Sequence, residues 1–324
     1  MHIVVTGAAG FIGSHTTERL VAAGHRVTGI DSFDSYLYAA EVKRNNAAQL
    51  ATLPADRFKL IEADICDVAA MEHAIAEDVD VVCHLAALAG VRPSLAEPLR
   101  YLRTNITGTG VLLERMRALG LRRLVFASSS SVYGAKPGRD LRAVTAFRED
   151  DPCLTPASPY AATKRMNELQ LSAHRDLFGI GVFALRFFTV YGPRQRPDMA
   201  IPKFMSAIAA GRPITVFGDG SSRRDYTYID DIVTGTVAAI ERVTPGSYEI
   251  FNLGGTHTIS LRELIDVVER VIGKPATIDW QPNQPGDVPV TYANIDRARA
   301  ALGYQPTTRV ELGVALQWEC FHQR

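Results

Sequence analysis

The chain has 324 residues and no formal net charge at neutral pH, because 35 Lys and Arg balance 35 Asp and Glu. Hydrophobic residues make up 47% and charged residues 22%, which is typical of a globular protein and excludes the weakly hydrophobic, highly charged composition of disordered chains. The zero balance gives no electrostatic reason to expect a nucleic acid or a charged membrane surface as a partner.

Cysteine usage and the apolar runs indicate the compartment. The four cysteines, at 66, 83, 153 and 320, lie far apart and form no CxxC pair, which is typical of reduced thiols. No apolar run approaches the roughly 20 residues of a membrane-spanning helix. The apolar start of the chain lacks a basic leader and breaks at Gly7, so it predicts a buried strand. We therefore expect a cytoplasmic protein without a membrane partner.

Short apolar strands alternate with helices through the first half of the chain. Strands are predicted over 3–5, 26–31, 58–63, 79–85, 124–128 and 179–188. Helices are predicted over 14–23, within 38–56, and over 68–76 and 110–118. This alternation predicts the α/β class, with a Rossmann-type doubly wound parallel sheet covered by helices on both faces.

After Tyr191 the composition of the sequence changes, and Gly, Pro and Arg become frequent. Ser260 and Glu263 form a capping-box pattern that predicts a helix ending at Gly273. Residues 281–288 are predicted to form a loop, and 135–159 a long irregular connection. We expect a large sheet domain over 1–188 plus about 225–254, and a smaller α/β substrate domain over about 189–224 and 255–324.

A glycine-rich turn follows the first predicted strand. Gly7, Gly10 and Gly13 form a GxxGxxG pattern that opens a helix. Glycines allow the backbone to approach a pyrophosphate closely, and the helix N-terminus supplies amide donors and a positive partial charge. The pattern therefore predicts a dinucleotide-binding turn, with Phe11 and Ile12 between its last two glycines.

The ends of the following strands supply further cofactor candidates. Asp31 ends the second strand, 18 residues after Gly13, where a carboxylate accepts hydrogen bonds from the adenosine ribose. Its charge would repel a ribose phosphate, so NAD is favoured over NADP. The remaining candidates follow the third and fourth strands, where packing or loop roles stay open: Asp64, Ile65, Leu85, Ala86 and Ala87.

Tyr160 and Lys164 form a YxxxK element whose spacing places both side chains on one helix face. A free tyrosine, with a pKa near 10, is a poor base at neutral pH, and a nearby ammonium group would favour the phenolate. Four serines, 128–131, end the fifth predicted strand, where a doubly wound sheet places its ligand crevice. A serine there can hydrogen-bond a reacting hydroxyl group.

Four motifs carry a resemblance to a known family: the glycine pattern of 7–13, Ser-Val-Tyr-Gly at 131–134, the Tyr160–Lys164 element, and Arg-Asp-Tyr at 224–226. With them the chain resembles the nucleotide-sugar epimerase branch of the extended short-chain dehydrogenases/reductases along essentially its whole length. Residues 31–36, 187–193, 196–200 and 284–288 carry a narrower resemblance to UDP-glucuronate 4-epimerases.

The resemblance implies a redox-neutral 4-epimerisation of a UDP-sugar through a 4-keto intermediate, with tightly bound NAD as the cofactor and no metal. Tyr160 would take the proton of the 4-hydroxyl group, Lys164 would hold the nicotinamide ribose, and Ser129 matches the catalytic serine of the family. Ser128 and Ser130 would be its neighbours around the sugar. The family also suggests a homodimer formed through helices near 99–118 and 159–174, although these helices could equally be covered within the monomer.

A 4-keto glucuronate is a β-keto acid and loses carbon dioxide readily, so an epimerase must hold its carboxylate in an unreactive orientation. An arginine suits this task because its planar fork binds a carboxylate through two hydrogen bonds. The candidate is Arg196, with Thr189, Ser128 and Ser130 as hydroxyl donors; a solvated or phosphate-binding role for Arg196 stays open. UDP-glucuronate to UDP-galacturonate is therefore the predicted reaction.

The segment from Arg194 to Arg224 holds six basic and two acidic residues and is expected to face the diphosphate. Arg212, Arg223 and Arg224 are the candidates, and Arg224 best matches the diphosphate arginine of the family. Asp287 would bind the uridine ribose. Gln284 stands where many relatives carry arginine, which leaves one cation fewer for the phosphates.

Several alternatives share these motifs. A UDP-glucose/UDP-galactose 4-epimerase would need no carboxylate clamp, and a UDP-glucuronate decarboxylase would differ mainly in how the carboxylate is held. A 4,6-dehydratase would need a carboxylate where Ser129 and Ser130 stand. A non-catalytic NAD-binding regulator is disfavoured by the intact Ser129, Tyr160 and Lys164.

Overall fold

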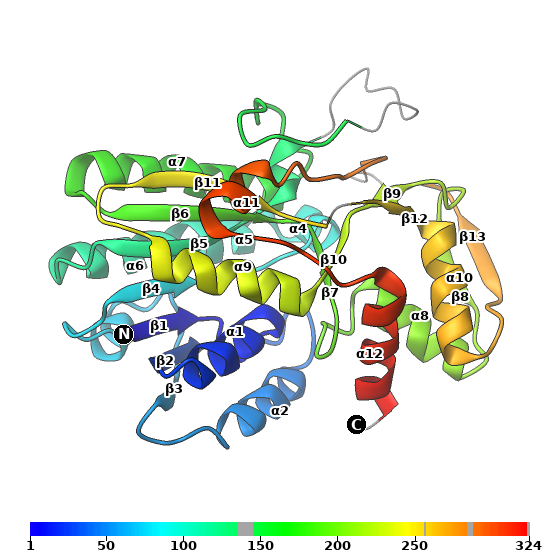
Figure 1. Ribbon diagram of the computed structural model, residues 1–324, viewed down its shortest axis with the longest axis horizontal. Coiled ribbons are helices and arrows are strands. Elements are labelled where there is room, and N and C mark those ends of the chain that lie inside the picture. The colour runs from blue at the N-terminus through cyan, green and yellow to red at the C-terminus, as the bar shows by residue number, and fades with distance from the viewer. Residues whose placement is uncertain (135–144, 256, 284–287, 323–324) are drawn as a thin grey trace.

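Seven parallel strands form the central sheet of the protein. The structure is a computed structural model that describes residues 1–134, 145–255, 257–283 and 288–322. The strand order is β11-β6-β5-β4-β1-β2-β3 (Figure 1). The bounds are β1 (His2–Thr6), β2 (Arg26–Asp31), β3 (Phe58–Glu62), β4 (Val81–His84), β5 (Arg123–Ser129), β6 (Gly181–Phe187) and β11 (Tyr248–Leu253). Each neighbouring pair is parallel, which confirms the predicted Rossmann-type fold.

Helices bury both faces of this sheet. Val125 and Ala127 of β5 join the core under α1 (Phe11–Ala22), α9 (Ile229–Arg242) and α11 (Asp296–Leu302). Leu124 and Phe126 of the same strand join the opposite core. The helices over that core are α3 (Val68–Ala74), α6 (Gly108–Ala118) and α7 (Pro159–Phe178). Because side chains alternate along a strand, a strand buried on both faces is apolar at nearly every position.

Four further helical segments surround the sheet. Their bounds are α2 (Ala40–Leu50), α4 (Val91–Ala96), α5 (Pro98–Tyr101) and the 3₁₀ turn η2 (Ser130–Tyr133). The helix that the sequence predicts from residue 110 begins at Gly108, as α6. A π-helical turn of six residues, η1 (Leu102–Thr107), precedes it and joins it to α5. The first helix starts at Phe11 rather than Ser14, because Gly10 is its N-cap.

A smaller α/β part lies beside the carboxyl ends of the large sheet (Figure 1). Its strands form three pairs, β8 (Ile214–Phe217) with β13 (Ile278–Gln281), β7 (Thr189–Tyr191) with β10 (Tyr226–Tyr228), and β9 (Arg223–Arg224) with β12 (Ile259–Ser260). Its helices are α8 (Ala200–Ala209), α10 (Leu261–Ile272) and α12 (Val310–His322), which share one apolar core with β8. Helix α11, although it follows α10 in the chain, packs against α9 and β11 of the large sheet part. The exact limits of the two domains stay a prediction.

The helix that the sequence marked most clearly is α10. The Glu263 amide donates to Ser260 Oγ (3.2 Å), and the Ser260 amide donates to the Glu263 carboxylate (2.6 Å), so both halves of the capping box form. Gly273 ends the helix with a left-handed φ of 74°. The predicted helix is thereby confirmed. Within the described residues, no helix is long and apolar enough to cross a membrane.

Candidate active site

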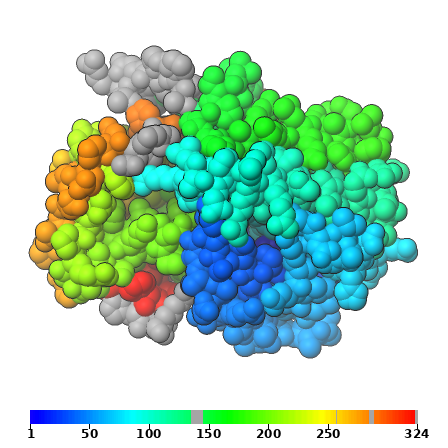
Figure 2. Space-filling view, turned by 180° about the vertical axis from the view of Figure 1, so that it is seen from behind, coloured from blue at the N-terminus to red at the C-terminus, as the bar shows by residue number. Residues whose placement is uncertain are grey.

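A cavity of about 1540 Å³ runs between the carboxyl edge of the large sheet and the smaller part. In Figure 2 the blue N-terminal surface meets the yellow-green surface of the smaller part, and a cyan segment reaches across their boundary. Arg92, in the segment after β4, contacts the smaller part: its guanidinium lies 4.6 Å from the centre of the Phe217 ring on β8. The cavity is therefore bounded by both parts of the chain.

The glycine-rich turn forms one wall of the cavity. Gly7 has a φ of 73°, and a Cβ at this position would lie 2.9 Å from the Ala86 amide nitrogen. A Cβ at Gly13 would lie 2.0 Å from the Gly7 carbonyl oxygen. Only glycine fits these two positions, since the backbone approaches too closely for a side chain. Gly10 caps α1 without a side chain, so the helix begins with its amide groups facing the cavity.

Asp31 stands at the end of β2 and supports this turn. Its carboxylate accepts hydrogen bonds from the Ala9 amide (3.1 Å) and from the Phe33 amide (2.9 Å). Burial raises the pKa of Asp31, while the Lys43 ammonium group and these amides act in the opposite direction. All predicted cofactor residues line the cavity, namely Gly7, Gly10, Phe11, Ile12, Gly13, Asp31, Asp64, Ile65, Leu85, Ala86, Ala87 and Lys164. This wall fits a dinucleotide.

Tyr160 and Lys164 lie on the first turns of α7, which Ser158 caps by accepting a hydrogen bond from the Ala161 amide (3.1 Å). Both side chains are buried and line the cavity. Burial raises the pKa of Tyr160, while the nearby Ser129 hydroxyl and the positive charge of Arg196 act in the opposite direction. The three predicted catalytic residues are thus brought together.

The Lys164 side chain is bound to the backbone of β5. Its ammonium donates to the Ala127 carbonyl oxygen (2.6 Å), and burial lowers its pKa to about 7. An effect of this ammonium group on the pKa of Tyr160 stays a prediction.

Arg196 is held in the cavity wall by Asp198. Its Nε and Nη2 donate to the two carboxylate oxygens of Asp198 (3.0 and 2.6 Å), and its Nη1 donates to the Ala89 carbonyl oxygen (3.2 Å). The Tyr38 ring lies 5.7 Å from the guanidinium. Arg196, Thr189, Ser128, Ser129 and Ser130 all line the cavity.

The predicted diphosphate residues are spread more widely. Arg224 lines the cavity, and its Nη1 donates to the Arg223 carbonyl oxygen (2.9 Å). Arg223 is directed toward Thr258 and Glu263. Arg212 is exposed, is not among the lining residues, and makes a long contact with Ser206 Oγ (3.5 Å). Asp287 and Gln284 lie outside the described residues.

Sequence reasoning missed several side chains that line this cavity. Tyr38, Lys43, Arg92, Ser131 and Asp198 are among them. Asp198 could have been found, since it follows Arg196 by two residues in a loop, where such pairs often meet. Ser131 stood in the serine run, and its amide and hydroxyl both contact Ser129 Oγ at 3.2 Å. Tyr38 and Arg92 carry no local signal, because only the fold brings them to the cavity.

The glycine turn, the YxxxK helix and the serine at the end of β5 define a short-chain dehydrogenase/reductase type of site. The sequence pattern of the NAD dependent epimerase/dehydratase family matches residues 3–254. The chain therefore belongs to this family.

Relatives with known names or structures agree with this assignment. The chain is 41% identical to UDP-glucuronate 4-epimerase of Thermodesulfobacterium geofontis, over 97% of this chain and 94% of the relative. It is similar to UDP-glucuronic acid 4-epimerase from Bacillus cereus, solved with UDP-glucuronic acid and NAD, at 38% identity and a TM-score of 0.90, covering 100% and 99% of the two chains. UDP-glucose 4-epimerase of Thermotoga maritima, solved with UDP-glucose, matches at 31% identity and a TM-score of 0.87, covering 100% and 99%.

Asp31→Asn tests the cofactor wall. The variant keeps the shape of the side chain but removes the charge that would bind the ribose hydroxyls and repel a ribose phosphate. Loss of a charge-assisted hydrogen bond costs about 1.5–3 kcal/mol, so the dissociation constant for NAD should rise roughly 10- to 100-fold and the preference over NADP should shrink. Titration calorimetry with both dinucleotides measures this. Unchanged NAD affinity and unchanged preference would contradict a role of the Asp31 carboxylate in binding the ribose.

Proposed function

We propose that the protein interconverts UDP-glucuronate and UDP-galacturonate by 4-epimerisation, with NAD as its cofactor. The single observation that carries this proposal is a partly buried, carboxylate-paired arginine, Arg196, in the wall of the cavity that also holds Tyr160 and Ser129. The relatives named for UDP-glucuronate support the same substrate. A cavity with an oriented cation in its wall suits a sugar that carries a carboxylate.

Tyr160 is the proton acceptor for the 4-hydroxyl group, and Ser129, whose hydroxyl lies near the phenol, binds the same oxygen of the sugar. Bound NAD supplies an acceptor for the hydrogen on carbon 4 and returns it after the 4-keto sugar has turned over. Lys164, which donates to the Ala127 carbonyl oxygen, is our candidate to hold the nicotinamide ribose. Because Tyr160 is buried, the proton it takes stays out of bulk water and can be returned to the same oxygen.

Arg196 restrains the carboxylate of the intermediate, which would otherwise lose carbon dioxide. A guanidinium has five N–H groups, and three of these are used by Asp198 and the Ala89 carbonyl oxygen among the described residues. One N–H on each of Nη1 and Nη2 remains for the substrate. Asp198 holds the plane of the fork, so a carboxylate bound to the remaining edge takes a fixed orientation. Thr189 and Ser130 line the same region.

We assign the far end of the cavity to the nucleotide. Arg224 lines the cavity and is our candidate for the diphosphate, and Lys203 also lines it. Arg212 for the phosphates and Asp287 for the uridine ribose stay predictions.

The product of the reaction tests the proposed function. With UDP-glucuronate the protein should yield UDP-galacturonate, without carbon dioxide and without net NADH, as followed by chromatography and absorbance at 340 nm. UDP-glucose is the matched neutral substrate. Turnover of UDP-glucose but not of UDP-glucuronate would favour the UDP-glucose 4-epimerase alternative, and a pentose product with carbon dioxide would favour the decarboxylase. Either result would contradict the proposal.

Arg196→Ala tests the carboxylate clamp. Removing the guanidinium should raise KM for UDP-glucuronate roughly 10- to 100-fold, because charge-assisted hydrogen bonds contribute about 1.5–3 kcal/mol, and carbon dioxide should appear among the products. NAD content and inhibition by UDP-glucose, which lacks the carboxylate, serve as controls and should stay the same. Wild-type activity in this variant would refute the clamp.

We also infer that the protein is located in the cytoplasm, a reducing compartment, and that it forms a homodimer. Its four cysteines are free. Apolar side chains project from adjacent helices, α5 with η1 on one side and α7 on the other: Leu99 is 78% exposed, Leu169 57% and Met166 46%. Covering this surface with a second copy would remove it from water.

Leu169→Glu tests the dimer surface. Light scattering should give about twice the 35.4 kDa chain mass for the wild type, and the single chain mass for the variant, since a buried carboxylate opposes association. Leu312→Glu on α12 is the matched control, because Leu312 is equally apolar and 56% exposed but lies in the smaller part. A wild-type monomer, or dissociation by the control variant alone, would contradict the assignment.

A further inference from the structure

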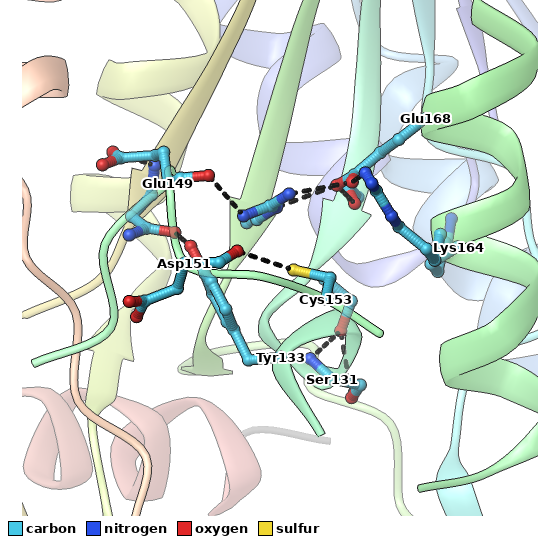
Figure 3. Close-up of polar contacts among 12 residues, drawn as sticks. Ser131, Tyr133, Glu149, Asp151, Cys153, Lys164 and Glu168 are labelled. Atoms are coloured by element: carbon cyan, nitrogen blue, oxygen red, sulfur yellow. Dashed lines mark hydrogen bonds and ion pairs between the residues drawn. The ribbon is translucent and has the colours of Figure 1, made fainter. Parts of the chain in front are cut away.

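A buried carboxylate lies directly behind the catalytic residues. Glu168 is on α7, four residues after Lys164 and eight after Tyr160, so the three side chains share one helix face. Its relative exposure is 0%. Figure 3 shows Glu168 and Lys164 extending from the same helix toward the sheet.

Four hydrogen bonds fill the two oxygens of this carboxylate. Oε1 accepts from Ser128 Oγ (2.6 Å) and from Arg186 Nε (2.9 Å). Oε2 accepts from Arg186 Nη2 (2.9 Å) and from Arg165 Nη1 (3.0 Å). The bidentate pair with Arg186 is buried on both sides, so each charge depends on the other for its stabilisation.

The Glu168 carboxylate connects three elements beside the cavity, namely α7, β5 and β6. Ser128 on β5 and Arg186 on β6 stand opposite one another in the sheet register, and Glu168 of α7 reaches both. One turn earlier, Lys164 donates to the Ala127 carbonyl oxygen. Two successive residues of β5 are thus bound to α7, and the next residue is Ser129.

The bond to Glu168 also decides what Ser128 can do for a substrate. A hydroxyl group has one proton to donate, and Ser128 gives it to Glu168. A substrate carboxylate only accepts hydrogen bonds. While this bond stands, Ser128 cannot be the carboxylate donor that the sequence predicts, although it lines the cavity.

We infer that Glu168 is a positioning residue, which acts through the Ser128 hydroxyl to fix the carboxyl end of β5 and thereby hold Ser129 at Tyr160. The inference rests on the proposed function, since it assigns a role within the same 4-epimerisation. The ion pair with Arg186 fixes Glu168 in the core. The hydrogen bond to Glu168 in turn fixes Ser128, which is the chain neighbour of the catalytic Ser129. The negative charge of Glu168 also counteracts the lowering of the Lys164 pKa by burial.

Ser128→Ala is the test, because Glu168→Gln would leave Arg186 without its buried counter-charge and destabilise the fold. In Ser128→Ala, both oxygens of Glu168 keep a bond to Arg186. The variant should lose about tenfold in kcat, since small displacements of a reacting group have large effects on rate. KM for UDP-glucuronate and inhibition by UDP-glucose should stay within about twofold of wild type. Ser128→Thr restores the hydroxyl group and should recover most of kcat.

Arg165→Gln is the control. It removes a donor from Oε2, which does not contact Ser128, and should leave kcat within about twofold of wild type. Wild-type kcat in Ser128→Ala, or no recovery in Ser128→Thr, would overturn the inference. A rise in KM for UDP-glucuronate without a change in UDP-glucose inhibition would also overturn it, since Ser128 would then contact the substrate carboxylate. Wild-type protein that forms no UDP-galacturonate would instead refute the proposed function.

Discussion

The parallel direction of all seven strands is the constraint on which the site depends. Parallel strands place their carboxyl ends on one edge of the sheet, so residues that are far apart in the chain meet there. The turn after β1 supplies the glycines, the end of β2 supplies Asp31, and the end of β5 supplies Ser129. Helices on both faces keep these ends rigid. The smaller part then needs only to cover this edge to form a cavity.

Charge in and behind the cavity is organised as pairs. Arg196 is paired with Asp198, and Arg186 with Glu168, each through two hydrogen bonds. A lone buried charge would be costly, whereas a bidentate partner stabilises it and fixes its orientation. Although the net charge of the whole chain is zero, individual guanidinium groups are held in fixed orientations in and behind the cavity. A sugar nucleotide with a carboxylate is a ligand of matching charge.

The sequence was informative where function follows from a contiguous pattern. The strand–glycine–helix start, the Tyr160–Lys164 spacing and the α10 capping box are local, and the structure has each of them. The direction of a side chain was not predictable when it depends on partners that only the fold supplies. Glu168 and Arg186 are 18 residues apart and meet across α7 and β6, which turns the Ser128 hydroxyl away from a substrate carboxylate. Lys164 likewise contacts a carbonyl of β5 rather than the phenol.

The central claim is that one cavity removes the hydrogen of carbon 4 and returns it to the same sugar while the carboxylate is retained. UDP-glucuronate labelled with tritium at carbon 4 tests this most directly. The account predicts that the label stays in the UDP-galacturonate formed and that none reaches water, because the hydrogen of carbon 4 would move as a hydride to NAD, where a hydrogen bonded to carbon does not exchange with water. Release of the label to water during turnover, or its loss from the product, would contradict the account.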